Sequence, residues 1–148
     1  MRSINVSNGG VPKLPQPSCL VTKRGLEGDR QRDLRYHGGP TRAVCLYSVE
    51  LIDALRGEGH PISAGSIGEN LTLSGIDWPA LAPGLRLAIG NACVELTSYA
   101  APCNNIAGSF RDREFVRVSQ KAHPGWSRLY AVVVKEGVVN VGDLVVQP

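Results

Sequence analysis

Glycine and proline interrupt this chain so often that most of its regular elements must be short. The 148 residues include 17 glycines and 10 prolines. Both residue types disfavour the interiors of helices, and both favour tight turns. Their frequency argues against a helical bundle and indicates short elements joined by many turns. A chain of this length usually forms one domain, so we expect a single domain over residues 1–148.

Alternation of apolar and polar residues indicates that the second half of the chain is rich in strands. Residues 85–89 and 94–96 alternate in this way, and the Gly90-Asn91 pair between them is typical of a two-residue hairpin turn. A run rich in β-branched side chains predicts a strand at 129–135. Turn residues separate this run from a last expected strand at 144–146.

The first half of the chain combines strands with one clear helix. Short strands are expected at 4–6 and 19–23. The run at 43–47 is apolar on both faces, which is typical of a buried strand. Ser48 can then cap a helix over 49–56.

A second short helix is expected within 111–120, because Phe115 and Val118 fall on one side of it. Together these elements predict a mainly β fold of the α+β class with a few short helices. Many short strands would expose open edges unless the sheet closed on itself. We therefore expect a compact, closed β-barrel.

Charge and hydropathy argue against several kinds of partner. The net charge is only +3, from 16 basic and 13 acidic side chains, and aromatic residues make up 5% of the chain. Nucleic-acid binders usually show a clustered basic face with stacking aromatics, so we expect no nucleic-acid partner. No apolar run is long enough to span a bilayer, and the N-terminus lacks the apolar core of a signal peptide. We expect a cytoplasmic protein with no membrane partner.

Cys103 differs in its setting from the other three cysteines. Cys19, Cys45 and Cys93 lie within expected strands, where a free thiol behaves as a small buried apolar group. Cys103 follows a proline in a polar connection just after a strand, and functional residues concentrate on such loops. A helical turn beginning near Ile106 would place the thiol at its positive end and lower its pKa. The alternative is a loop cysteine without a role, and the lack of a C-x-x-C spacing argues against a zinc site.

An arginine-rich stretch, residues 24–42, is a second candidate functional segment. It carries five arginines and three acidic residues, with closely spaced glycines. Glycines let backbone N–H groups approach an anion, and arginines bind phosphate through two parallel hydrogen bonds. The stretch is either an anion-binding loop or a solvated surface loop with weak ion pairs. His37 within it is either a base, ligand or anion donor, or a structural loop residue.

Two glycine-containing turns carry further polar candidates. Lys13 follows the first turn, and Glu69 and Asn70 follow the second. Glu69 and Asn70 either orient a ligand or satisfy backbone groups of their turn. The residues alone therefore support a β-rich domain with a polar, arginine-lined site and one candidate thiol.

In their order along the chain, these segments resemble the MOSC family, the domain found at the C-terminus of molybdenum cofactor sulfurase. The resemblance covers nearly the whole chain and rests on residues 9–13, 25–29, 37–43, 65–70, Pro102-Cys103 and 136–143. Single matches are weak, but six in the family's order are specific. The chain resembles stand-alone bacterial members, and the subgroup that includes the hydroxylaminopurine reductase is the nearest we can suggest.

The resemblance implies a β-barrel-like fold with a site for the molybdenum cofactor, molybdopterin. It makes Cys103 the catalytic residue in one of two roles. In one role the cysteine carries a persulfide sulfur for delivery to a metal–sulfur centre. In the other its thiolate ligates molybdenum at a site that reduces N-hydroxylated small molecules. Both roles need a thiolate.

The cofactor carries phosphate, so the resemblance implies that basic side chains at motif positions bind it: Lys13, Arg30, His37 and Arg42. Three more residues match motif positions and either contact the cofactor or hold the loops together: Asp29, Glu69 and Asn70. The 148 residues include no ferredoxin, flavin or cysteine-desulfurase segment, so we expect an electron donor or sulfur donor to act in trans. Pyridoxal phosphate is not required. The alternative is a non-catalytic module that binds an anion or a partner through residues 24–42.

Overall fold

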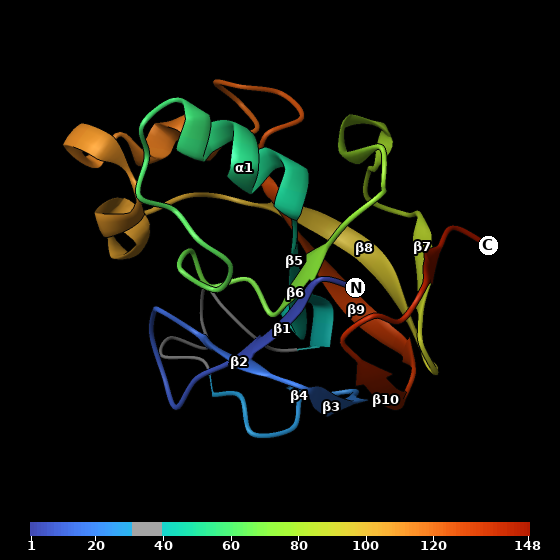
Figure 1. Cartoon of the computed structure of the whole chain (residues 1–148). Helices are drawn as coiled ribbons and strands as arrows, with labels where there is room; N and C mark the ends of the chain where they lie inside the picture. Colours follow the sequence, from blue (N-terminus) through green and yellow to red (C-terminus); the bar gives the residue numbers. More distant parts are fainter. Residues whose placement is uncertain (31–39) are drawn as a thin grey trace.

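An eight-stranded sheet forms the framework of the computed structural model, which describes residues 1–30 and 40–148 (Figure 1). Its strands are β1 (Ser3–Val6), β2 (Leu14–Gln16), β5 (Val44–Ser48), β6 (Leu71–Leu73), β7 (Arg86–Ile89), β8 (Ala92–Ala100), β9 (Arg128–Lys135) and β11 (Val145–Val146). Their order in the sheet is β11-β7-β8-β9-β5-β6-β1-β2. The β5–β6 pair is parallel, and the other described neighbours are antiparallel.

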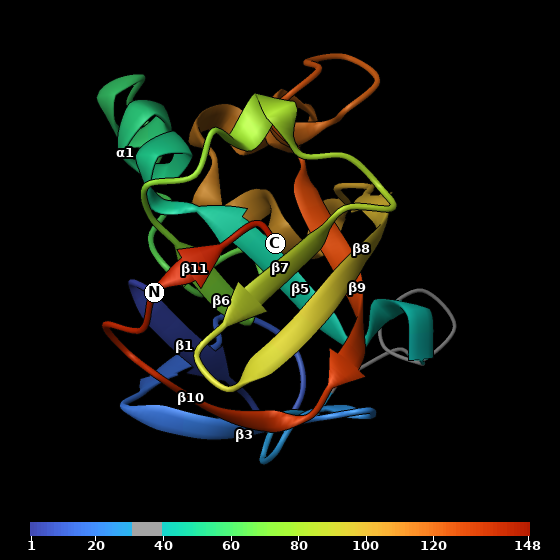
Figure 2. The same cartoon turned by 90° about the vertical axis from the view of Figure 1, so that its right-hand side faces the viewer.

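This sheet is open, so the expected closed β-barrel is wrong. Its outer strands, β11 and β2, do not pair with each other in the described part of the chain. Both are very short and every residue of β2 is exposed, so neither offers the edge that closure requires. A separate sheet of β10 (Gly137–Asn140), β3 (Ser18–Thr22) and β4 (Gly25–Leu26) covers one end of the molecule (Figure 2). It buries Val21 and Val139 in the common core.

The expectation of a mainly β fold with a few short helices is confirmed. The expected buried strand lies at the centre of the large sheet, and the expected helix comes after it. Strand β5 lies between β9 and β6, and all of its residues are buried. Helix α1 (Val49–Gly57) follows directly, and its Ile52 and Leu55 are buried. The Ser48 hydroxyl accepts a hydrogen bond from the N–H of Leu51 at 3.3 Å, so the helix begins where a side chain satisfies a free donor of its first turn.

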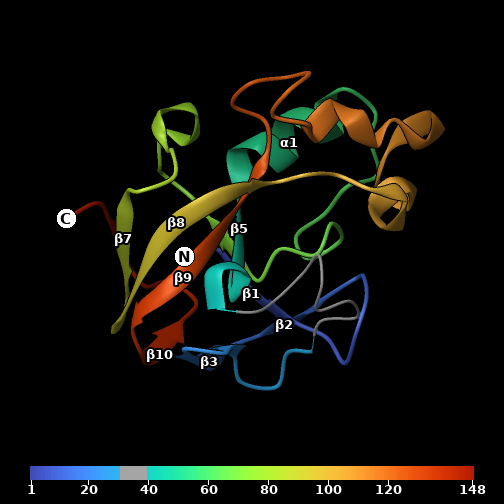
Figure 3. The ribbon, with the colours of Figure 1, turned by 180° about the vertical axis from the view of Figure 1, so that it is seen from behind.

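The expected hairpin is also present. Gly90-Asn91 connects β7 to β8, and the φ of Gly90 is +54°, in the left-handed region that such turns require. Strands expected at 4–6, 19–23, 129–135 and 144–146 are found within one residue of those bounds. Strand β8 continues beyond its expected end to Ala100 and leads towards η3 (Asn104–Ser109), a 3-10 helix (Figure 3).

The single helix expected within 111–120 is wrong. Two short 3-10 turns, η4 (Arg111–Arg113) and η5 (Phe115–Val118), take its place. Asp112 and Arg113 have φ values of 55° and 59°, and this left-handed backbone interrupts any continuous helix. The remaining 3-10 turns described are η1 (Pro40–Arg42) and η2 (Trp78–Ala80). Within the described residues, none of the helices has the length and apolar character needed to cross a membrane.

Candidate functional site

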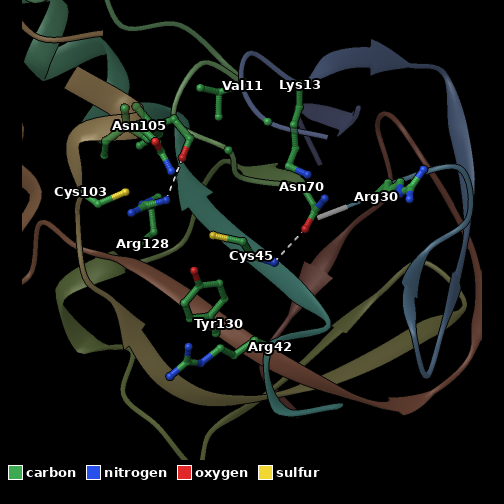
Figure 4. A pocket seen from close by; sticks show the side chains of 14 residues that line it. Val11, Lys13, Arg30, Arg42, Cys45, Asn70, Cys103, Asn105, Arg128 and Tyr130 are labelled. Atoms are coloured by element: carbon green, nitrogen blue, oxygen red, sulfur yellow. Dashed lines mark hydrogen bonds between the residues drawn. The ribbon is translucent and has the colours of Figure 1, made fainter. Parts of the chain in front are cut away.

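One face of the two central strands forms the floor of a cavity. Cys45 of β5 lies opposite Tyr130 of β9, and Arg128 precedes Tyr130 by two residues. Cross-strand partners and alternate residues of one strand share a face of the sheet, so these three side chains project together. The walls come from several other segments: Gly10, Val11 and Lys13; Arg30; Arg42; Ile67, Gly68 and Asn70; Cys103, Asn105 and Ile106 (Figure 4).

The turn that carries Lys13 and the turn that precedes β6 are held together above this floor. The N–H of Lys13 donates to the carbonyl oxygen of Gly65 at 2.9 Å. Gly65 has a φ of +83°, and a Cβ at this position would overlap the backbone carbonyl group of Lys13. Only glycine fits such a backbone conformation and such a close approach without strain. The glycine-containing turns noted in the sequence therefore build the cavity wall.

The cavity brings together five residues that the sequence analysis selected from distant segments: Lys13, Arg30, Arg42, Asn70 and Cys103. Figure 4 shows Cys103 and Arg30 on opposite sides of the cavity, with Asn70 between them. Asp29 and Glu69 do not line the cavity: Asp29 binds Lys13 of its wall, and Glu69 binds Gly65 in the turn that carries Ile67 and Gly68. His37 lies outside the described residues.

Asp29 is the centre of a buried polar network behind the wall. Its carboxylate accepts hydrogen bonds from Lys13 Nζ at 2.7 and 2.9 Å, from the N–H of Ser7 at 2.9 Å and from Asn70 Nδ2 at 2.9 Å. Asn70 in turn accepts from the N–H of Cys45 at 3.0 Å through its Oδ1. Lys13 is therefore paired with a carboxylate, and Asn70 links that pair to the floor strand.

Glu69 supports the turn before β6. Its Oε1 accepts hydrogen bonds from the N–H of Gly65 at 2.5 Å and from the hydroxyl of Thr72 at 3.1 Å. The side chain is fully buried, and burial raises the pKa of its carboxyl. Its Oε2 has no hydrogen-bond partner among the described residues. Of the two interpretations left open for Glu69, this geometry matches the one in which it satisfies backbone groups.

Arg128 is a site residue that the sequence analysis missed. It is 3% exposed, and its guanidinium donates from Nη1 to the carbonyl oxygen of Ile67 at 2.8 Å and from Nη2 to that of Ala101 at 3.4 Å. It therefore connects two walls of the cavity. The available signal was a charged residue at the start of an otherwise apolar strand, two positions before a tyrosine.

The thiols differ in their surroundings. Cys103 is half-buried, lines the cavity and directly precedes η3, so the expected helical turn after it is confirmed. Cys45 is buried, and burial raises its pKa to about 11. The expectation that Cys19 and Cys93 are buried is wrong, because both are half-buried. Cys93 alternates with the core-facing residues of β8, whereas Cys19 shares the face of Val21 and packs against the margin of the core.

The cavity therefore places a thiol among several basic groups. The Arg42 guanidinium lies 5.5 Å from the centroid of the Tyr130 ring, within range of a cation–π interaction. Burial raises the pKa of Tyr130, so its phenol remains a neutral hydrogen-bonding group. No three His, Cys, Asp or Glu side chains in the described ranges form a group that could hold a metal ion.

Comparison with known proteins identifies relatives of this chain. A model of the MOSC domain matches residues 33–146. The chain is 33% identical over 135 residues to the uncharacterized protein YflK of Bacillus subtilis, covering 90% of this chain and 60% of YflK. It is 28% identical over 142 residues to protein YiiM of Escherichia coli, covering 86% of this chain and 62% of YiiM. The chain thus spans about 60% of the length of these two relatives.

Solved structures share the fold. YiiM from Geobacillus stearothermophilus has a TM-score of 0.75 and 27% identity, covering 99% of this chain and 73% of that chain. The YUAD protein from Bacillus subtilis has a TM-score of 0.73 and 17% identity, covering 97% of this chain and 92% of that chain. At the latter identity the likeness concerns the fold alone.

Proposed function

Because the chain belongs to the MOSC domain family, we propose that its cavity binds the molybdenum cofactor and that Cys103 is the residue at which the chemistry occurs. One observation carries this proposal: Cys103 lines the same cavity as four basic side chains from distant segments, namely Lys13, Arg30, Arg42 and Arg128. A thiol among cations suits a ligand that joins an anionic group to a sulfur-binding metal.

The residues of the cavity fit the two ends of such a cofactor. Cys103 is partly exposed and would serve as a soft ligand to molybdenum. Arg30, on the opposite side, would bind phosphate together with Lys13. Arg128 also lines the cavity, and its guanidinium would offer N–H donors to a polar group of the ligand. When bound, the cofactor supplies the redox chemistry of its metal.

We propose that the reaction is the reduction of N-hydroxylated small molecules, with electrons from a donor that acts in trans. Cys103 would hold the metal, and the Tyr130 hydroxyl would hydrogen-bond the polar end of the substrate. Ile67 and Ile106, which also line the cavity, would contact its apolar body.

A second role for Cys103, carriage of a persulfide sulfur, is favoured by one observation. Cys103 is partly exposed, whereas Cys45, the other thiol of the cavity, is buried with a pKa of about 11. The thiolate is the form that attacks sulfur, so Cys45 is unreactive near neutral pH. In this role Cys103 would receive sulfur from a donor and pass it to a metal–sulfur centre.

Metal and pterin analysis tests the proposal. The full chain, produced in a host that makes molybdenum cofactor, is expected to contain molybdenum and pterin in proportion to protein. Cys103→Ala should lose the metal. Cys93→Ala, which removes another half-buried thiol outside the residues lining the cavity, should retain it.

Two results would contradict cofactor ligation by Cys103. One is the absence of molybdenum and pterin from the wild-type protein. The other is equal molybdenum content in wild type and Cys103→Ala. Anion binding that survives Cys103→Ser but weakens in Arg30→Ala or Arg42→Ala would instead support the non-catalytic binding module.

A further inference from the structure

We propose that Arg128 forms a subsite for small sulfur oxyanions beside Cys103, and that thiosulfate bound there donates its outer sulfur to the Cys103 thiolate. The inference rests on the sulfur-carrying role proposed for Cys103 and names the class of donor that this role requires. It follows from a buried positive charge that has no carboxylate partner among the described residues.

The Arg128 guanidinium contacts only neutral acceptors in the described part of the chain. These are the carbonyl oxygens of Ile67 and Ala101, at 2.8 and 3.4 Å. Nε is buried and has no partner there. None of the ion pairs found within residues 1–30 and 40–148 includes Arg128. Burying a cation without a counter-charge is costly, so a bound anion would stabilise Arg128 as it stands among the described residues.

The two buried carboxyl groups near the wall do not supply that anion. Asp29 is paired with Lys13, and Glu69 already accepts bonds from the N–H of Gly65 and the hydroxyl of Thr72. Burial raises the pKa of Glu69, and the attraction of Arg128 is a weaker, opposing influence. Neither carboxyl group forms an ion pair with Arg128 in the structure of residues 1–30 and 40–148.

The position of Arg128 directs an anion towards the reactive thiol. Arg128 and Cys103 line the same cavity, and Figure 4 shows them next to each other on one side of it. The bond from Nη2 holds the carbonyl of Ala101, two residues before Cys103, and so fixes the approach of the thiol-bearing segment.

A sulfur oxyanion satisfies both groups at once. Its oxygens accept hydrogen bonds from guanidinium N–H groups, and such charge-assisted bonds are strong. Thiosulfate adds an outer sulfur that a thiolate can attack. A neutral sulfur donor would offer Arg128 no negative charge.

The transfer step is balanced without a further oxidant or reductant. The Cys103 thiolate attacks the outer sulfur of thiosulfate and forms a new S–S bond. The bond between the two thiosulfate sulfurs breaks, and its electron pair leaves with sulfite. The products are the Cys103 persulfide anion and sulfite, with the total charge unchanged. Arg128 would stabilise the departing sulfite.

Two alkylating reagents test the subsite separately from any sulfur transfer. Iodoacetate is anionic and iodoacetamide is neutral, but both react with the same thiolate, so the ratio of their rates is independent of its ionisation. Relative to a cysteine peptide, the wild-type ratio at Cys103 should favour iodoacetate by roughly tenfold, and sulfate should suppress that preference. Arg128→Gln should abolish it and Arg128→Lys should keep part of it. Arg86→Gln, at an exposed arginine of β7, is the matched control and should not change it.

Three results would overturn the subsite. The first is a wild-type ratio equal to that of the peptide, and the second is a ratio that Arg128→Gln leaves unchanged. The third is an equal loss in Arg42→Gln, which would assign the preference to the general positive field of the cavity. If Arg128→Gln does not fold, the wild-type ratio, its suppression by sulfate and the Arg128→Lys variant decide the question.

Mass spectrometry tests the transfer itself. Full-length protein from a host that makes no molybdenum cofactor is incubated with thiosulfate. The peptide containing Cys103 should gain one sulfur atom, with sulfite released in equal amount, and cyanide should remove the sulfur as thiocyanate. Cys103→Ser should gain none. An unmodified wild-type peptide would overturn thiosulfate as the donor. Neither measurement depends on the cofactor, so a failure of molybdenum binding is separately recognised.

Discussion

The Lys13 ammonium donates to both carboxylate oxygens of Asp29, at 2.7 and 2.9 Å, with side-chain exposures of 8% and 1%. The pair joins the turn before β2 to the residues after β4. Asn70 extends it to the floor of the cavity by donating to the same carboxylate. Lys13 therefore contributes less net charge to the cavity than its position in the sequence suggests.

Removing the Asp29 charge should destabilise the protein strongly. In Asp29→Asn the Lys13 ammonium stays buried without its counter-ion, which costs about 3–5 kcal/mol when one partner of a buried pair is lost. Urea unfolding measures this change in the free energy of unfolding. Glu95→Gln is the matched control, because the Arg86–Glu95 pair is more exposed and should contribute at most about 1 kcal/mol. Equal effects in the two variants would refute the structural role of Asp29.

Gly65 and Gly75 provide a comparison of backbone strain with and without steric overlap. Both have positive φ, +83° and +76°, so Ala at either position should cost roughly 1–2 kcal/mol. At Gly65 the new Cβ would also overlap the Lys13 carbonyl group, whereas nothing lies near Gly75. Gly65→Ala should therefore lower the free energy of unfolding clearly more than Gly75→Ala. Indistinguishable urea midpoints would contradict the close approach of these two turns.

The Glu69 carboxyl should make the free energy of unfolding decrease as pH rises. Burial raises its pKa in the folded protein above the ordinary value of 4.5. The folded state then binds more protons than the unfolded state, so this contribution is fully present below pH 4.5 and is lost as pH rises through the folded pKa. Glu69→Gln cannot titrate, so its stability relative to wild type should increase over that window. Urea unfolding at a series of pH values measures it, and a difference that is flat or falls with pH would exclude this source.

The cysteines of the folded protein should react with an alkylating reagent at different rates, according to their positions in the fold. Iodoacetamide at neutral pH is expected to modify Cys103 in the folded protein and to leave Cys45 unmodified, because burial blocks access and raises the pKa of Cys45 to about 11. Burial also raises the pKa of Cys19, so its modification should be slow. Peptide mapping before and after unfolding in urea locates the label. Early label on Cys45 with Cys103 inert would count against both roles proposed for Cys103.

The sequence by itself determined those helices, strands and turns that depend on residues close together in the chain. Ser48 begins α1 because its hydroxyl accepts from an N–H three residues later, and Gly90-Asn91 turns the β7–β8 hairpin because glycine tolerates positive φ. The apolar run of β5 predicted a buried strand, and Cys103 was distinguished from the three strand cysteines by its position in a loop. In each case the signal in the sequence lies within a few neighbouring residues.

Tertiary structure decided whether the sheet closes and which side chains meet in the cavity. Closure depends on both edge strands, and β2 is short and exposed, which no local pattern revealed. Arg128, Cys45 and Tyr130 share a face only because β5 pairs with β9 in one register. A shift of one residue would turn each side chain of the shifted strand to the other face. That register results from packing between segments distant in the chain, so the residues around Cys103 could be recognised singly in the sequence but assembled only by the fold.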